Sequence, residues 1–323
     1  GKISHLLLLS LVFAGAMAFG QPLQADLPVT NGYVSSMVQD GNMLYMGGRF
    51  TYAGQNTGRG VLLSTTTGTY DPTFPKVNGT VNVCVSDSQG GWYIGGSFTK
   101  VGSTYRSNLA HIKSGYTVDV SWNPNADAEV KAIALYGSTV YVGGYFTHVG
   151  GAARNYAGAV DAVTGLATAW NPDPNGGVWA ITATSSTVYF GGLFTTININ
   201  AAQVFRSNIA AVDAVAGTAT AWNPGAVSAS GLFGFVVYGL KLADNDSTLF
   251  VWGNIGTLGG TTRRGAGALY TTVTSGYATA WNPNVYKGVA TGFVYSLDFS
   301  GDTVYVGGDF SKIKTTTNTR NKI

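Results

Sequence analysis

Ionisable side chains that could do chemistry are few and scattered along this chain. His5 lies near the N-terminus, and the other two histidines, His111 and His148, occupy different places in the sequence pattern. A metal site needs several converging ligands, and isolated histidines usually only make hydrogen bonds. No pair of carboxylates recurs at a spacing typical of glycoside hydrolysis. We therefore predict no catalytic residues, no metal site and no cofactor.

The acidic stretch at residues 244–247 is the strongest candidate for a cation site. Its sequence, Asp-Asn-Asp-Ser, resembles the start of a calcium loop. A calcium loop also needs a glycine for its sharp turn and a downstream glutamate that binds through both oxygens, and this stretch has neither. The sequence therefore favours an ordinary polar hairpin there.

An arginine recurs just ahead of an alternating apolar segment. Its copies are Arg59, Arg106, Arg154, Arg206, Arg264 and Arg320. A residue that every repeat carries is usually part of the repeat's own architecture, where a guanidinium donates to loop carbonyls or stacks on a tryptophan. Alternatively, a ring of arginines around a channel would bind an anionic ligand, with Arg106, Arg154 and Arg206 as candidate binding residues. We favour the structural role.

The elements that position these residues are repeated along the chain. The word Gly-Gly-x-Phe starts at Gly47, Gly95, Gly143, Gly191 and Gly307, with a degraded copy at residues 253–256. The first four copies are 48 residues apart. A period of about 40–50 residues built from short strands is typical of a β-propeller, with one blade per repeat. We predict an all-β fold, a β-propeller of six four-stranded blades, with a longer array of blades as the alternative.

A second word, Trp-Asn-Pro, follows in most copies. It starts at Trp122, Trp170, Trp222 and Trp281, with residues 71–74 in the equivalent place of the first copy. We predict a structural role for it, since Trp buries a large ring, Asn caps the turn and Pro stiffens the exit.

The third copy shows the pattern of one repeat most clearly. Its sequence predicts strand a at residues 130–135, strand b at 139–146, strand c at 155–161 and strand d at 166–170. The glycine pair closes strand b, where a missing side chain permits close backbone approach by the neighbouring blade. We expect the phenylalanine that follows to pack between blades.

The two ends of the chain predict how the propeller closes. Residues 26–30 look like a strand d, so we expect them to form the outer strand of the last blade and remove its free edges. The sixth copy stops just inside its strand c at Ile323, from which we expect the propeller, residues 21–323, to be truncated at its C-terminus.

The N-terminus is typical of a signal peptide. Lys2 precedes a 13-residue apolar segment, residues 6–18, that ends in a small-x-small sequence. We predict a signal peptide at residues 1–20, with cleavage after residue 18, 20 or 25. A membrane anchor needs about 20 apolar residues, so we predict no membrane span. The protein is expected to be extracellular or at the cell surface, with the periplasm as an alternative.

Composition excludes other classes of partner. Charged residues make up 10% of the chain, the net charge is +3, and no run of Lys or Arg occurs, so we predict no nucleic-acid binding. The single cysteine, Cys84, lies in an alternating strand and is expected to be a small buried side chain.

Three sequence words together resemble a known family. Residues 140–146 (VYVGGYF), 154–165 (RNYAGAVDAVTG) and 168–172 (TAWNP) resemble bacterial secreted β-propellers of the delta-60 repeat type. They are more loosely similar to the Gly-Gly-Asn-Phe repeats of fungal cortical polarity markers. The resemblance covers residues 26–323 and implies the fold and export, but it implies little about activity.

These observations predict a secreted, monomeric binding or scaffold module that is not an enzyme. Insertions on one face of a repeat protein commonly mark its binding side. Residues 196–204 lengthen a b–c loop and residues 225–235 lengthen a d–a loop on the same face, where Phe233 and Phe235 would contact a protein or carbohydrate partner. The alternative is a hydrolase, lyase or quinone-dependent dehydrogenase whose site lies in the central channel and uses scattered Asp residues, His111 or His148.

Overall fold

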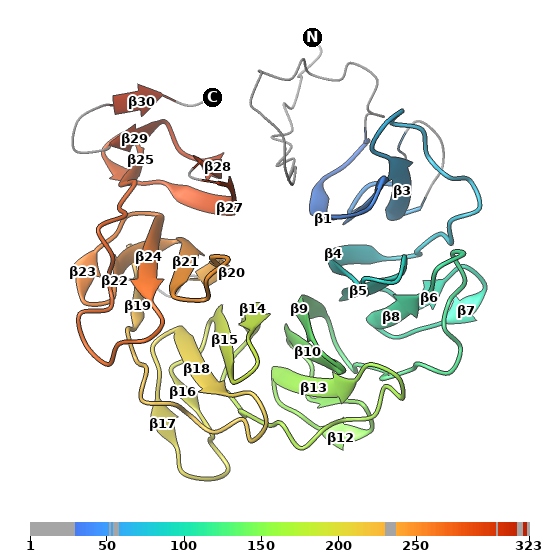
Figure 1. The fold of residues 1–323 in the computed structure, drawn as a ribbon, viewed down its shortest axis with the longest axis horizontal. Coiled ribbons are helices and arrows are strands. Elements are labelled where there is room, and N and C mark those ends of the chain that lie inside the picture. The colour runs from blue at the N-terminus through green and yellow to red at the C-terminus, as the bar shows by residue number, and fades with distance from the viewer. Residues whose placement is uncertain are drawn as a thin grey trace. The chain divides into compact units, whose positions relative to one another are not determined.

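The computed structural model describes residues 30–51, 53, 58–229, 237–301, 303–314 and 319–321. It falls into two compact units that divide between Gly225 and Ala226, here called the N-terminal and the C-terminal unit. The described residues form short antiparallel β-sheets and no helix, which confirms the all-β prediction (Figure 1). Nothing helical in these ranges is long and apolar enough to cross a membrane.

The N-terminal unit contains one three-stranded sheet for each of its four sequence repeats. The sheets are β1 (Val34–Asp40), β2 (Met43–Gly48) and β3 (Gly60–Ser64); β4 (Thr80–Ser86), β5 (Trp92–Ser97) and β8 (Leu109–Ile112); β9 (Val130–Tyr136), β10 (Thr139–Gly144) and β13 (Ala157–Asp161); and β14 (Val178–Ala183), β15 (Thr187–Gly192) and β18 (Ile209–Asp213). In each sheet the second strand of the repeat is central. The predicted strands a, b and c of the third repeat are therefore confirmed as β9, β10 and β13.

Between the second and third strands, the second, third and fourth repeats each form a small extra hairpin. These are β6 (Lys100–Val101) with β7 (Thr104–Tyr105), β11 (His148–Val149) with β12 (Ala152–Ala153), and β16 (Thr196–Ile197) with β17 (Val204–Phe205). We call them the b–c hairpins. The sequence analysis predicted loops at these places.

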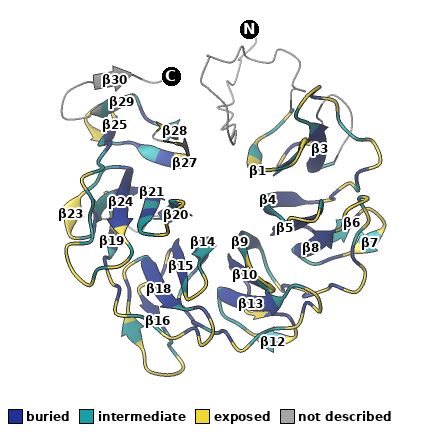
Figure 2. Ribbon diagram, in the orientation of Figure 1, coloured by how far each residue is buried: buried dark blue, intermediate teal, exposed yellow. Residues whose placement is uncertain are grey.

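The four sheets of the N-terminal unit pack side by side. Their first strands β1, β4, β9 and β14 contact one another in chain order, and the third strands lie on the far side of each sheet (Figure 1). The core lies between neighbouring sheets: one cluster packs Tyr45 and Leu62 of the first repeat against Trp92 and Ile94 of the second. Buried residues accordingly concentrate in the second and third strands of these sheets, whereas β1 is intermediate or exposed along its length (Figure 2).

Strand d is reduced to a single bridge, so the prediction of four regular strands per repeat is wrong. Residues 166–170 pair with β13 only at Val160↔Ala167, and the first, second, fourth and fifth repeats show the same. The corresponding bridges are Leu63↔Tyr70, Ile112↔Val118, Val212↔Ala219 and Leu269↔Ala278. The ladder stops there because the tryptophan that follows turns its ring into the core and the proline has no amide hydrogen to donate.

The first glycine of the Gly-Gly-x-Phe word lies against the next sheet, as we predicted, whereas the second makes room within its own sheet. A Cβ on Gly143 would lie 2.5 Å from a methyl carbon of Val178 in the next sheet, and a Cβ on Gly144 would lie 2.2 Å from the carbonyl oxygen of Glu129 in its own sheet. The phenylalanine that closes the word, such as Phe146, is buried. The first glycine thus permits sheet-to-sheet contact, and the second permits a β-bulge in the first strand.

The C-terminal unit repeats the pattern less regularly. Its sheets are β20 (Val237–Leu242), β21 (Thr248–Gly253) and β24 (Ala266–Tyr270); β19 (Ala226–Ser228), β22 (Ile255–Leu258) and β23 (Thr261–Thr262); β27 (Phe293–Ser300) and β28 (Thr303–Asp309); and β26 (Ala290–Thr291), β25 (Val285–Lys287), β29 (Lys312–Lys314) and β30 (Thr319–Asn321). The degraded word at residues 253–256 places Ile255 where other repeats have the variable residue x, and its side chain is buried.

One end of the chain differs from the closure prediction. Thr30 was expected in the outer strand of the last repeat, but it forms a bridge with Ala53 of the first repeat. The neighbouring Asn31 holds Thr51 through two hydrogen bonds, as Asn78 holds Thr99 in the second repeat. Thr30 therefore belongs to the connection that precedes β1. Residues 26–29 lie outside the described residues.

We expect Gly144→Ala to destabilise the protein by about 3 kcal/mol, because the new methyl group would collide with the Glu129 carbonyl and remove the bulge. Urea unfolding followed by circular dichroism measures the change. Gly137→Asn is the matched control: Gly137 has φ +56°, which Asn tolerates, and a Cβ there meets nothing within 4 Å. Equal losses for the two variants would contradict this account of the glycine pair.

Candidate functional site

The recurring arginine binds the backbone of its own repeat. In the third repeat, Arg154 follows β12 and donates to the carbonyl oxygens of Ala153 (2.8 Å), Thr168 (2.5 Å) and Trp170 (3.1 Å). Arg106 donates in the same way to Asp119, and Arg206 to Thr220. The guanidinium thus connects the b–c hairpin to residues 166–170, the segment predicted as strand d, which makes a single bridge with its sheet. Ligand binding by Arg106, Arg154 and Arg206 stays a prediction.

Two of the predicted copies of this arginine do not occupy the position. In the fifth repeat the equivalent residue is Arg263, which donates to the carbonyls of Thr262 and Thr279, whereas Arg264 donates to Thr291 and lies over the ring of Tyr286. Arg59 donates to the Thr80 hydroxyl at 3.4 Å. Adjacent arginines cannot be told apart by spacing once the repeat length varies. The Arg320 side chain lies outside the described residues.

Two of the Trp-Asn-Pro tryptophans, Trp122 and Trp170, form contacts between neighbouring repeats of the N-terminal unit. Trp122 and Trp170 are buried, and their Nε1 atoms donate to the carbonyls of Asp161 and Asp213 in the next repeat, both at 3.0 Å. Trp222 is also buried and Trp281 partly so. Each packs on the aromatic ring of its own second strand, as Tyr141 does on Trp170 with ring centroids 5.2 Å apart.

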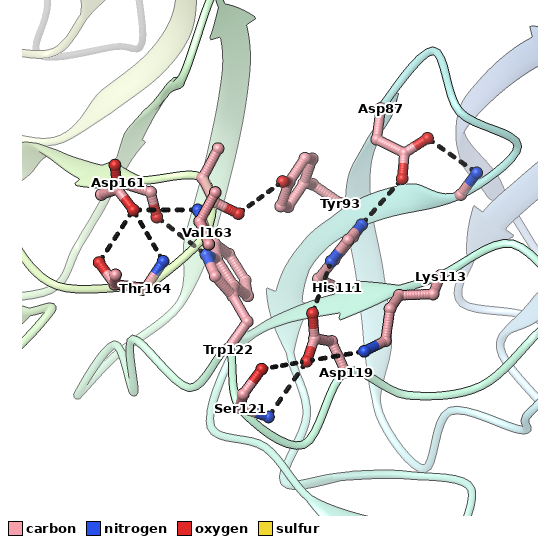
Figure 3. A network of polar contacts seen from close by, with 12 residues as sticks. Asp87, Tyr93, His111, Lys113, Asp119, Ser121, Trp122, Asp161, Val163 and Thr164 are labelled. Carbon is pink, nitrogen blue, oxygen red and sulfur yellow. Dashed lines mark hydrogen bonds and ion pairs between the residues drawn. The ribbon is translucent and has the colours of Figure 1, made fainter.

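The structure brings His111 together with two carboxylates that the sequence pattern did not connect (Figure 3). Its Nε2 lies 2.9 Å from Asp87, and its Nδ1 lies 3.3 Å from Asp119. The Tyr93 ring stacks on the imidazole with centroids 4.3 Å apart, and Lys113 pairs with Asp119 at 3.3 Å. Burial acts to raise the pKa of both carboxyls, but hydrogen bonds from His111 and nearby groups outweigh it and hold the pKa of each below its usual value.

This His111 group has the geometry of a structural clamp. The ring is only 8% exposed, both of its nitrogens face carboxylates, and it lies on the third strand β8, away from the edge formed by the first strands. It joins the β4–β5 turn to the segment after β8. Among the described residues, no group of His, Cys, Asp and Glu side chains has the arrangement of a metal site.

His148, the other histidine considered for catalysis, pairs with Asp127. The two side chains are largely exposed and meet at 3.1 Å. Asp127 occupies the place that asparagine holds in the first, second and fourth repeats, since it accepts from the amide of Thr147 as Asn175 does from Thr195. Burial acts to raise the pKa of Asp127, but these hydrogen bonds outweigh it and lower the pKa to about 2.

A different set of residues occupies the β-bulge in the first strand of each repeat. A bulge redirects a side chain and often lies next to a functional site. The bulge residues are Ser35, Asn82, Lys131, Trp179, Tyr238 and Tyr295. Their identity changes from repeat to repeat while the surrounding words stay constant. The constant residues hold the sheets together, so the bulge carries different side chains without a change in the pairing of the first two strands.

In the N-terminal unit the bulge residues connect to one another across the first strands. We call Asn82, Glu129, Lys131, Tyr145 and Trp179 the bulge cluster. The Asn82 amide and the Lys131 ammonium donate to Glu129 Oε1, at 2.9 and 2.8 Å. The ammonium also lies 5.4 Å from the centroid of the Trp179 ring.

Trp179 is held in turn by Tyr145, the variable residue of the Gly-Gly-x-Phe word. Its indole donates to the Tyr145 hydroxyl at 2.9 Å, and the two rings meet edge to face with centroids 6.2 Å apart. The Tyr145 ring needs Gly177 beside it, because a Cβ there would lie 2.6 Å from the ring. Burial, more than the Glu129 charge, raises the pKa of the Tyr145 hydroxyl, so this residue remains a neutral hydrogen-bonding group.

The b–c hairpins place further aromatic side chains in solvent at the same end of the sheets. Tyr105 in β7 is 77% exposed and Phe205 in β17 is 76% exposed. The lengthened hairpin between β16 and β17 is anchored by Asn200, which donates to buried Asp173 at 2.6 Å. Phe233 and Phe235, the aromatic residues proposed for this face from sequence, lie outside the described residues.

Sequence reasoning missed the bulge cluster because it followed the constant words. Three signals in the sequence pointed to the cluster. Glu129 is the only glutamate of the chain. The residue at the bulge differs between repeats, and so does the residue at position x of the Gly-Gly-x-Phe word. Which of these varied residues meet depends on the register between neighbouring sheets, and repeat spacing does not encode that register.

We expect Arg154→Met to destabilise the protein by about 2–3 kcal/mol, since it leaves the carbonyls of Thr168 and Trp170 without their donor. Urea unfolding checks this. Arg49→Met is the control, because Arg49 is exposed at position x of the first repeat and should change stability by less than about 0.5 kcal/mol. A loss for Arg49→Met as large as that for Arg154→Met would refute the backbone role.

We expect Asp127→Asn to reduce the acid sensitivity of the fold. The folded-state pKa of about 2 is below the ordinary 3.8, so the carboxylate stabilises the protein above about pH 4 and loses this contribution as pH falls towards 2. Melting temperature measured across this range should fall less steeply in the variant. The reverse exchange, Asn175→Asp, should steepen the fall; identical profiles for all three proteins would contradict the assignment.

Comparison with known proteins finds similarity in fold only. No protein-family model and no curated protein matches this chain. Among solved structures, the chain is similar to the crystal structure of the computationally designed Ika8 protein, with 12% sequence identity and a TM-score of 0.50 over 88% of this chain and 84% of that one. The computationally designed Ika4 protein gives 13% identity and a TM-score of 0.39 over 54% of this chain and 92% of that one.

Proposed function

We propose that this chain is a secreted, monomeric β-propeller of six repeats that binds an extracellular ligand and does not transform it. The apolar N-terminal segment supports export, and the resemblance to delta-60 repeat proteins supports both export and fold. The side-by-side packing of the first strands in the N-terminal unit supports a propeller.

The proposal of a binding role is supported by the position of the residues that vary between repeats, which lie at one end of the sheets. The first strand begins and the second strand ends at the same end of each antiparallel sheet, as the pairing of Val130 with Gly144 illustrates. The bulge cluster and the b–c hairpins with exposed Tyr105 and Phe205 therefore lie at this end, here called the binding end. The opposite end carries the β9–β10 turn and the turn after β13, where Val163 is exposed.

Nothing in the described residues favours the enzyme alternative. His111 has both nitrogens engaged by carboxylates and lies on a third strand, whereas a general base must reach the proton that it abstracts. His148 contacts Asp127 on an exposed hairpin. In the bulge cluster, Lys131 and Asn82 hold the Glu129 carboxylate as a hydrogen-bonded ion pair, an arrangement suited to recognising a ligand.

An array of immobilised glycans and peptides tests this proposal. We expect the intact chain to bind members of the array, and the double variant Tyr105→Ser/Phe205→Ser to bind at least tenfold more weakly. The matched control is Val163→Ser/Val215→Ser, which changes two equally exposed side chains at the opposite end. All four side chains are exposed, so melting temperatures should be nearly unchanged. No binding to the array, or binding lost only in the control, would refute the proposal.

A further inference from the structure

We infer that the bulge cluster binds a neutral carbohydrate. This inference rests on the proposed function, that the binding end of the sheets receives an extracellular ligand, and it names the class of that ligand. It follows from the balance of charge in the cluster, from the polar atoms that the cluster leaves available, and from its aromatic pair.

The charges of the bulge cluster are already balanced. Lys131 and Glu129 form an ion pair at 2.8 Å, and their side chains are 21% and 30% exposed. An anionic or a cationic ligand would have to separate this half-buried pair and leave one partner uncompensated, which is unfavourable. A ligand without charge can bind beside the pair and leave it intact.

The polar atoms that remain suit a ligand with many hydroxyl groups. Within the described part of the chain, both hydrogen bonds to Glu129 fall on Oε1, so Oε2 is left to accept. The Asn82 amide nitrogen donates to Glu129 and to the Val130 carbonyl, which leaves Oδ1 to accept. Lys131 has two further N–H donors. Donors and acceptors so close together match neighbouring sugar hydroxyls, each of which both donates and accepts.

The aromatic pair supplies the apolar side of such a site. Trp179 is fixed by its hydrogen bond to Tyr145 and by the edge-to-face contact with that ring. A rigid aromatic ring beside a few fixed polar groups is the usual composition of a small-ligand site. The Lys131 ammonium lies 5.4 Å from the centroid of the Trp179 ring, so the aromatic pair stands directly beside the polar atoms of the cluster.

The C-terminal unit carries a similar set of its own. Its bulge residues Tyr238 and Tyr295 stack with centroids 6.0 Å apart, and Tyr295 is 59% exposed. Lys241 pairs with Asp298 on the neighbouring first strand and lies 4.6 Å from the centroid of the Phe299 ring. Each unit thus has aromatic bulge residues and a Lys–carboxylate pair of its own.

Native gel electrophoresis through polysaccharides tests the inference with the intact chain. The probes are three neutral polymers, namely β-glucan, galactomannan and dextran, and the anionic polymer polygalacturonate. We expect at least one neutral polymer to retard the protein. Trp179→Ala should weaken this retardation at least tenfold. Glu129→Gln keeps the shape of the side chain and should weaken it about threefold to tenfold, because a neutral amide is a poorer acceptor than a carboxylate.

Tyr136→Ala is the matched control, since Tyr136 is an exposed aromatic residue at the opposite end of β9 and should leave retardation unchanged. Melting temperatures are measured for all variants; if Trp179→Ala does not fold, Glu129→Gln decides. The inference is overturned if only polygalacturonate retards the protein, if no polymer does, or if retardation is unaffected by the cluster variants. Peptide binding on the array without retardation would refute the carbohydrate alone, whereas an empty array would refute the proposed function as well.

Discussion

The packing of one tyrosine–tryptophan pair onto the next repeat is the interaction on which the rest of the structure depends. In the second repeat, Tyr93 packs on Trp122 with centroids 5.0 Å apart, and both donate to carbonyls of the third repeat, at Ala162 and Asp161. Tyr141 and Trp170 continue this pattern into the fourth repeat. Three short strands cannot bury a core alone, so the sheets of the second, third and fourth repeats depend on this contact with one another.

The same contact explains the other constant residues. The first glycine of each pair allows the next sheet to approach, and the tryptophan that leaves the sheet early converts strand d into a single bridge. The carbonyls of that segment then need other donors, and the arginine of the b–c hairpin supplies them. Glycine, tryptophan and arginine therefore act together when short sheets pack side by side, because each residue makes a contact that the others require. This dependence explains why they recur together in the repeats.

Because these residues hold the sheets, other positions can vary at little cost in stability. Asp127 replaces an asparagine by a carboxylate that accepts the same hydrogen bonds, and the His111 group adds a clamp to one repeat only. At the bulge, side chains range from Ser35 to Trp179 without disturbing the pairing of the first two strands. A repeat protein can thus place a ligand site on an unchanged framework, through its varied positions.

The sequence by itself determined the all-β class, the strands of the third repeat and the close approach of the next sheet at Gly143, because each depends on local periodicity or on contact between repeating units. The role of Gly144, which makes room for the bulge of its own sheet, was decided by the tertiary structure. Only the tertiary structure distinguished Arg263 from Arg264, placed Thr30 beside Ala53 and joined Glu129 with Lys131, Asn82 and Trp179. These contacts depend on the register between sheets, and residues about 48 positions apart carry no local signal of which side chains will meet.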